Sequence, residues 1–147
     1  QTTSLLSFSS TKNKKQTSTI MNQFPHKELT GKNLEAFYYV YNKIGFGFEK
    51  QIYQNGMTKK FGNLSVNFEK EQLIPISFEK EKIGEFKVDF IVERKVVVMI
   101  GNSKEIESAD SLRLENIVKQ SEYDIGLFVN FGMKPDQRRK IWDQYFE

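Results

Sequence analysis

Two amphipathic segments follow each other near the start of the chain. In residues 31–44 the apolar side chains recur every three to four positions, as on one face of an α-helix, and Thr30 precedes them as an N-cap. Gly45 and Gly47 interrupt this pattern, and residues 48–61 resume it. The positions of the second segment that we expect to face the core are Ile52, Tyr53, Met57 and Phe61. The pattern therefore predicts two consecutive helices.

The pattern then changes to the alternation that is typical of β-strands. Residues 63–70, 72–80, 83–93 and 95–102 alternate or run apolar between short turns rich in Glu, Lys and Gly. We expect four consecutive antiparallel strands, with the charged runs 69–72, 79–82 and 92–95 as solvated turns. Residues 96–100 are apolar throughout, so they should be buried on both faces of a sheet.

A helix, a strand and a last helix are predicted for the remainder. Residues 106–122 carry Leu112, Leu114, Ile117 and Val118 at mixed helical spacing, and residues 123–131 form an apolar strand, so the helix should be a crossover. Residues 134–147 should form a short helix that Pro135 opens. We expect it to pack through Ile141, Trp142 and Phe146. These elements predict an α/β fold with a mixed central sheet of four to five strands flanked by helices.

The charge of the chain is unevenly distributed. The formal net charge is +3, but four lysines lie in residues 1–27, which contain no Asp or Glu. This leaves 18 of the 22 Lys and Arg residues against all 19 Asp and Glu residues in 28–147, so the expected domain is close to neutral. A domain that neutralises several phosphates usually carries a concentrated basic face, so nucleic-acid binding by the domain is the weaker expectation.

Composition excludes several kinds of site. The chain has no cysteine and one histidine, His26, so disulfides, thiolate zinc sites and Ser/His or Cys/His pairs are excluded from the predicted domain. Carboxylates remain as the candidate metal ligands. No apolar run approaches the roughly 20 residues of a membrane-spanning helix, so we expect no transmembrane segment, although the protein could be a peripheral part of a membrane assembly.

Residues 1–27 differ in composition from the rest of the chain. They are rich in Ser, Thr, Lys and Gln, and the chain begins at Gln1, as it would after removal of a presequence. This composition resembles the mature end of a precursor imported into an organelle, and the alternative is an ordinary flexible tail. We therefore expect an extended N-terminal tail over 1–27, one domain over 28–147, and a mitochondrial location.

The first predicted helix carries an aromatic group. Phe37, Tyr38 and Tyr39 are consecutive and therefore fan over about 200° of the helix, and Tyr41 follows two positions after Tyr39. At least one ring should be exposed and available to a partner, unless the whole group packs into the core.

Three segments together resemble the GxxExxY family of the PD-(D/E)XK nuclease superfamily. They are LTGKNLEAFYYVYNKIGFGFEKQIYQ, KIGEFKVDFIVERKVVVMI and IGLFVNFG, which span about 29–132. The resemblance lies in the paired glycines before the second helix, in the Gly-Glu-aromatic-x-x-Asp strand and in the Asn-Phe-Gly strand end. Scaffold positions that match are Gly45, Gly47, Tyr53, Gly84, Asp89, Asn130 and Gly132. The resemblance implies a restriction-endonuclease-like core.

The catalytic positions of the family are changed. In such nucleases, acidic residues bind Mg²⁺ and a lysine assists at the attacked phosphate. The resemblance places Lys50 where the family has a helix glutamate, whereas the strand aspartate is retained as Asp89. Met99 and Gly101 stand at the Glu-x-Lys pair, and Arg113 stands at a glutamine. A single carboxylate cannot hold Mg²⁺ against its hydration shell, so we expect no nuclease activity, no metal and no cofactor.

Lys50 and Asp89 suggest a replacement for the lost metal. We expect the Lys50 ammonium to lie near Asp89 and to neutralise a partly buried carboxylate. The alternative is that Lys50 extends into solvent.

Three functions are compatible with these observations. The first is a non-catalytic subunit of a large mitochondrial assembly, such as a respiratory-chain complex, ATP synthase or mitoribosome, with protein subunits as partners. The second is a pseudonuclease that binds nucleic acid in the remnant groove, where Lys50 and Arg113 would add positive charge. The third is an active metal-dependent nuclease, for which the required ligands are missing from the sequence.

Overall fold

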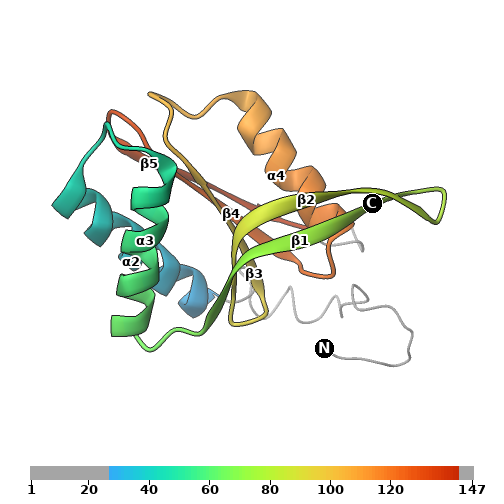
Figure 1. Cartoon of the computed structure of the whole chain (residues 1–147), viewed down its shortest axis with the longest axis horizontal. Helices are drawn as coiled ribbons and strands as arrows, with labels where there is room; N and C mark the ends of the chain where they lie inside the picture. The colour runs from blue at the N-terminus through green and yellow to red at the C-terminus, as the bar shows by residue number, and fades with distance from the viewer. Residues whose placement is uncertain (1–26, 143–147) are drawn as a thin grey trace.

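Two helices, three strands, one helix and two further strands follow one another along the described part of the chain (Figure 1). The computed structural model describes residues 27–142. Its elements are α2 (Lys27–Ile44), α3 (Lys50–Asn63), β1 (Phe68–Phe78), β2 (Glu81–Val92), β3 (Val96–Gly101), α4 (Ser108–Gln120), β4 (Ile125–Phe131) and β5 (Pro135–Ile141). None of the three helices in this range has the length and apolar character needed to cross a membrane.

The strands form one mixed sheet in the order β1-β2-β3-β4-β5. Neighbouring strands are antiparallel except β3 and β4, which pair in parallel with Val96 opposite Ile125 and Gly101 opposite Asn130. A parallel pair needs a crossover, and α4 provides it. The predicted mixed sheet and the predicted crossover helix are both confirmed.

Helices cover both faces of the sheet, and each face has its own apolar core. On one face, α2 and α3 pack through residues such as Phe37, Tyr53 and Phe61. On the other face, α4 packs through Leu114, Ile117 and Val118. The strand residues Val96–Ile100 alternate between these two cores and are all buried, as expected. Burial of this much apolar surface on two faces is the main stabilising term of the fold.

The helices depart from the sequence prediction at three positions. α2 begins at Lys27, so Thr30 lies inside the helix and is buried rather than serving as its N-cap. In α3, Tyr53, Met57 and Phe61 are buried as predicted, but Ile52 lies on the outer side with 37% of its surface exposed. Ile52 is rotated about 100° around the helix from the buried Tyr53, and this rotation puts it outside the side of α3 that faces the sheet. In α4, Leu112 is likewise exposed.

The two strands predicted over 63–70 and 72–80 are one strand, β1. α3 continues to Asn63, which removes the start of the first predicted strand. The charged run 69–72, which we expected to be a turn, lies within β1, where Glu71 has a left-handed φ of 53°. One such residue produces an irregularity rather than a reversal, so both flanking residues still pair with β2. The expected turns at 79–82 and 92–95 do fall at or beside the strand ends.

The predicted C-terminal helix is wrong, because Pro135–Ile141 form the edge strand β5. Phe131 pairs with Pro135 and Ile125 with Ile141, so β5 covers the whole length of β4. Proline is tolerated at the first residue of an edge strand. Trp142 packs against the apolar core on the α4 face, whereas Ile141 is partly exposed. Phe146 lies outside the described residues, as does the predicted tail up to residue 26.

β1 and β2 extend past the sheet as a two-stranded ribbon, seen in Figure 1 as the long hairpin. Only Phe90–Val92 of β2 pair with β3, whereas β2 pairs with β1 from Glu81 to Val92. The side-chain amide of Gln120 holds the ribbon to α4. Its Oε1 accepts a hydrogen bond from the amide of Ser77 at 3.0 Å, and its Nε2 donates to the Ser77 carbonyl at 3.3 Å.

Candidate functional site

Asp89 lies where β2 separates from β3. The ladder between these strands ends at the pair Phe90 and Val98, so Ile100 has no partner on β2. The Oδ2 atom of Asp89 accepts the hydrogen bond of the Ile100 amide at 2.7 Å instead. The carboxylate therefore completes the edge of β3 at the point where the backbone of β2 turns away.

Two side chains of α3 bind the other oxygen of this carboxylate. Gln54 Nε2 donates to Asp89 Oδ1 at 3.2 Å, and Lys50 Nζ lies 3.1 Å from the same atom. Lys50 and Gln54 are four residues apart and therefore share one face of the helix. The Asp89 side chain is 8% exposed and that of Lys50 is 50% exposed. The expected ion pair is confirmed, and the alternative of a solvated Lys50 without this contact is wrong.

Gln54 is the site residue that the sequence prediction missed. It is buried and joins α3 to Asp89. Its signal was present in the sequence, because a residue four positions after Lys50 must point in the same direction. A polar residue between the core positions Tyr53 and Met57 is also unusual unless it has a buried partner.

Met99 and Gly101 lie at the end of β3 and face the other side of the sheet. Met99 is 6% exposed and belongs to the core on the α4 face together with Phe128. Gly101 lies against the same ring: a Cβ atom there would be 2.5 Å from Phe128 Cζ and 2.7 Å from Asn130 Oδ1. A longer side chain cannot be placed at residue 101 unless these neighbours move.

Arg113 is not part of the Lys50 and Asp89 contact. It projects from α4, is about half exposed, and pairs with Asp110 of the same helix at 3.4 Å. The structure therefore brings together two of the five positions that the sequence singled out, Lys50 and Asp89. Met99 and Gly101 support the packing beneath Phe128, and Arg113 lies on the surface of α4.

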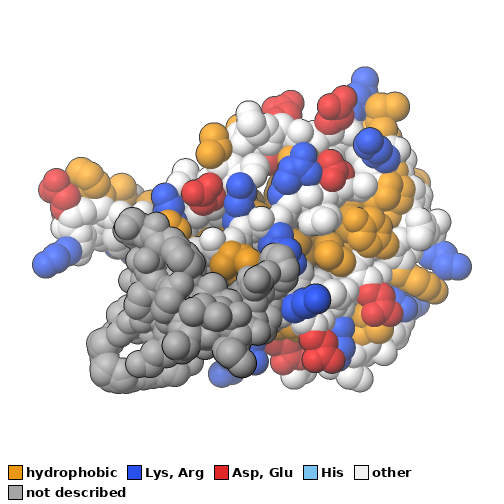
Figure 2. Space-filling view, turned by 180° about the vertical axis from the view of Figure 1, so that it is seen from behind, with side chains coloured by type: hydrophobic (Ala, Val, Ile, Leu, Met, Phe, Trp, Pro, Cys, Tyr) orange, Lys and Arg blue, Asp and Glu red, His pale blue; other side chains and the backbone are white. Residues whose placement is uncertain are grey.

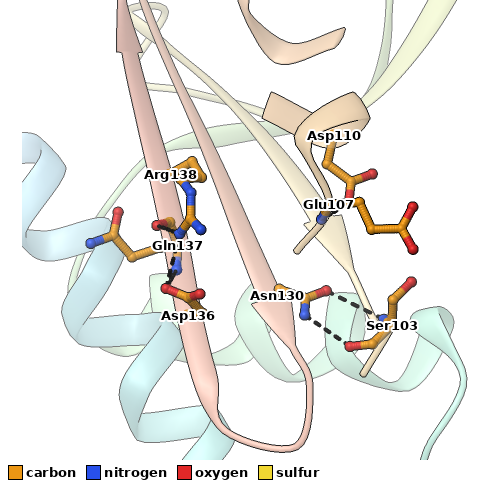
Figure 3. Close-up of polar contacts among 7 residues, drawn as sticks. All are labelled: Ser103, Glu107, Asp110, Asn130, Asp136, Gln137 and Arg138. Carbon is orange, nitrogen blue, oxygen red and sulfur yellow. Dashed lines mark hydrogen bonds and ion pairs between the residues drawn. The ribbon is translucent and has the colours of Figure 1, made fainter. Parts of the chain in front are cut away.

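The loops around this end of the sheet are tied together by side chains. Asn130, at the end of β4, donates to the Ser103 carbonyl at 2.8 Å and accepts from the Ser103 amide at 3.3 Å (Figure 3). Tyr41 of α2 donates its hydroxyl hydrogen bond to the Gly132 carbonyl at 2.8 Å. Gly132 leaves no room for a Cβ, which would lie 2.5 Å from the Lys104 carbonyl. The Asn-Phe-Gly strand end therefore connects β4 to the loop after β3 and to α2.

The residues present do not fit a magnesium ion. Mg²⁺ requires near-octahedral oxygen ligands, but the Asp89 oxygens already accept hydrogen bonds from Ile100 and Gln54 and pair with the Lys50 ammonium. Within residues 27–142 there is no group of three or more His, Asp or Glu side chains that could hold a metal ion. The cation beside Asp89 is supplied by the protein itself.

A surface hollow lies away from this site. Its volume is about 420 Å³, and it is lined by Asn67, Phe68, Glu69, Ile91, Glu93 and Arg94. These residues surround the turn that precedes β3, whereas Asp89 contacts the opposite end of the strand at Ile100. The hollow therefore contributes nothing to the candidate site.

The comparisons with known proteins agree with the fold. Residues 27–141 match the model of the PD-(D/E)XK nuclease superfamily, and the chain therefore belongs to this superfamily. Neither the curated proteins nor the solved structures gave a match.

Proposed function

We propose that this protein is a catalytically inactive PD-(D/E)XK domain of the GxxExxY type that serves as a structural, protein-binding subunit of a larger assembly. The observation that carries the proposal is the ion pair between Lys50 and Asp89, because it puts an ammonium group where the resemblance expects a second metal-binding carboxylate.

The partners of Asp89 support the loss of metal chemistry. Removing the Lys50 ammonium would still leave Ile100 and Gln54 bonded to the carboxylate. A metal ion would have to displace these donors, and a buried amide without an acceptor costs about 1–3 kcal/mol. In this domain the aspartate has a structural role, since it closes the ladder between β2 and β3.

The end of β3 supports the same proposal. The family lysine would stand at Gly101, where a Cβ would already collide with the ring of Phe128. The packing around residue 101 thus fits a domain whose strand end has been rebuilt around an aromatic ring. Scaffold contacts such as Tyr53 stacked on Phe131, with ring centroids 4.0 Å apart, are in place.

Charge argues against nucleic acid as the main partner. Of the two basic side chains that the sequence suggested for the remnant groove, Lys50 is paired with Asp89, and Arg113 lies away from this site and is paired with Asp110. Affinity for nucleic acid grows with the number of phosphates that Lys and Arg neutralise. Side chains that already pair with aspartates therefore add little to this affinity. Protein surfaces are therefore the better candidate partners. The basic, acid-free segment 1–27 supports a mitochondrial assembly as the setting.

The native mass of the full chain tests this proposal. The chain would be tagged at its own locus, extracted from organelles in mild detergent, and separated by size with mass spectrometry of the co-migrating proteins. Migration with a large particle of defined composition is the expected result. Migration as a free monomer or dimer would overturn the proposal, and retention by RNA or DNA in a salt-sensitive manner would favour the pseudonuclease alternative.

A cleavage assay tests the inactivity directly. Purified full-length chain would be incubated with DNA and RNA substrates in Mg²⁺ or Mn²⁺, beside an Asp89→Ala variant purified in the same way. We expect no cleavage above that of the variant. Metal-dependent cleavage that Asp89→Ala abolishes would show that the domain is an active nuclease.

A further inference from the structure

The ribbon formed by β1 and β2 is covered on one face only. Beyond the last pair of β2 with β3, at Phe90, it comprises residues 72–88. Ile74, Ile76 and Phe86 belong to the core on the α4 face or pack against it. Because side chains alternate along a strand, the residues between these three point to the other face. We call that face the open face of the ribbon.

Apolar side chains lie on the open face and at the tip of the ribbon. Leu73 is 54% exposed, and Pro75 is also exposed. Pro75 is paired with Glu85, and Ile83, two positions before Glu85, shares its face and is 63% exposed. Phe78, at the tip, is 61% exposed. Figure 2 shows the ribbon projecting from the body of the domain, with apolar side chains and charged side chains of both signs toward its free end. Exposed apolar groups gathered on one projection indicate a contact surface.

The charges of the ribbon are balanced in number. The charged residues of 72–88 are three glutamates and three lysines: Glu79, Lys80, Glu81, Lys82, Glu85 and Lys87. Lys82 and Glu85 pair with each other. Among the residues that the structure describes, the other four form no ion pair. The tip, residues 79–81, therefore has two glutamates against one lysine, whereas Lys87 lies at the base.

The neighbouring charges leave this difference between tip and base in place. Lys70 and Glu71, the charged residues next to the base on β1, carry opposite charges. Asp89, two positions after Lys87 on β2, is paired with Lys50. The ribbon is therefore negative at its tip and positive at its base. Such a surface is complementary to a copy of itself that has been turned through 180°.

We infer that the open face of the ribbon is a self-association surface, covered by the ribbon of a second copy that lies antiparallel to it about a two-fold axis. Leu73 lies two positions from Pro75 toward the base, and Ile83 lies two positions from Glu85 toward the tip. An axis at the pair of Pro75 and Glu85 therefore brings Leu73 of one copy onto Ile83 of the other.

The same axis decides the direction of the second ribbon. It brings the negative tip of each copy toward Lys87 of the other, and in a two-fold contact this attraction forms twice. A parallel arrangement would place tip on tip and base on base, where like charges repel. Charge and apolar positions therefore select the same antiparallel arrangement.

The size of the open face predicts a weak dimer. Six residues of a strand span about 20 Å, and the ribbon is two strands wide. This is smaller than the roughly 800 Å² per partner that stable interfaces bury, so we expect a dissociation constant of about 100 µM. The inference goes beyond the proposed function and does not depend on the loss of catalysis, because it concerns how two copies of the domain lie against each other.

Disulfide formation tests the arrangement, because the chain has no cysteine of its own. Full-length Leu73→Cys and Ile83→Cys chains, carrying tags of different size, would be mixed under mild oxidation. A disulfide requires Cα atoms within about 7 Å, so we expect the mixed disulfide to form about tenfold faster than either disulfide between identical chains. Leu112→Cys, at a position on α4 that is 58% exposed, is the matched control and should show no preference for either partner. Equal rates for all combinations would overturn the inference.

Charge reversal tests the pairing of tip and base. The full-length chain would be studied by sedimentation velocity between about 10 and 500 µM, a range that brackets the expected dissociation constant. Lys87→Glu alone and Glu79→Lys/Glu81→Lys alone should each weaken the dimer about tenfold. An equal mixture of these two variants should dimerise again, because the reversed tip of one chain then meets the reversed base of the other. Lys104→Glu, the same charge change outside the ribbon, is the control and should leave the dimer unchanged.

Two results of this experiment would overturn the inference. One is a wild-type chain that remains monomeric over the whole range, and the other is a mixture that dimerises no better than the separate variants. Native size distinguishes this failure from that of the proposed function. A monomeric purified chain whose endogenous form migrates with a large particle refutes only the self-association. A purified chain that dimerises as expected, but whose endogenous form migrates as a free dimer, refutes only the structural-subunit proposal.

Discussion

Asp89 Oδ2 accepts the hydrogen bond of the Ile100 amide at 2.7 Å, and this contact replaces the missing rung between β2 and β3. Removal of the carboxylate in Asp89→Ala leaves the buried amides of Ile100 and Gln54 without acceptors. We expect the free energy of unfolding to fall by about 2–3 kcal/mol, measured by urea denaturation. Asp89→Asn keeps one acceptor for Ile100 and should lose about half as much. Equal stability of the alanine variant and the wild type would contradict this role.

Lys50→Glu restores the acidic residue that the resemblance expects in α3. It places a second carboxylate beside Asp89, and like charges at this distance destabilise the fold. We expect a lower melting temperature than that of the wild type, and a partial recovery when Mg²⁺ or Mn²⁺ is added, because paired carboxylates attract divalent cations. Lys50→Gln removes the cation without adding a carboxylate and serves as the control. An equal metal-dependent shift in the wild-type protein would contradict the proposed inactivity.

Gly101→Ala tests the packing at the end of β3. The added Cβ must displace the Phe128 ring, so we expect a loss of about 1–3 kcal/mol in the free energy of unfolding. Gly31→Ala is the matched control, because no atom lies within 4 Å of its Cβ and it stands inside α2. That substitution should be neutral or stabilise the domain by about 0.5–1 kcal/mol. The two variants can be compared in one set of denaturation curves, and equal effects would show that residue 101 is not crowded.

Tyr123 should make the stability of the domain depend on pH in the alkaline range. Burial raises the pKa of Tyr123 above its usual value of about 10, and the negative charges of Glu122 and Glu69 raise it further. The unfolded chain then releases this proton at a lower pH than the folded chain does. Stability is therefore unaffected by this group below about pH 10 and falls as the pH rises toward the folded pKa. We expect Tyr123→Phe to lose less stability than the wild type between pH 9 and 11, measured by urea midpoints. Parallel loss in both proteins would contradict the expectation.

The helices and the central strands could be predicted because their patterns are long and regular. α3 and α4 agree with their predicted ranges to within two residues, and the run Val96–Ile100 is buried on both faces. β5 could not be predicted in the same way. Its charged residues suit an edge strand and an exposed helix equally well, and only its pairing with β4 decides between them.

Some contacts of the candidate site could likewise be predicted from the sequence, and others could not. The contact of Lys50 with Asp89 followed from family spacing and from the cost of an unpaired buried carboxylate. The bond from Asp89 to the Ile100 amide did not, because it depends on where β2 leaves the sheet. The crowding at Gly101 also depends on the parallel register that brings Phe128 and Asn130 beside it. Such register-dependent contacts leave no local signal in the sequence.

The Gln120 amide on Ser77 has a consequence for how copies of this domain can associate. Along β1 it occupies both hydrogen-bonding groups of one residue on the outer side of the sheet, and nearby Pro75 has no amide hydrogen to offer. On the opposite border, β5 carries the charged residues Asp136, Arg138, Arg139 and Lys140, and charged side chains on an edge strand disfavour pairing with a further strand. Both borders of the sheet therefore carry features that disfavour edge-to-edge addition of a strand from a second copy.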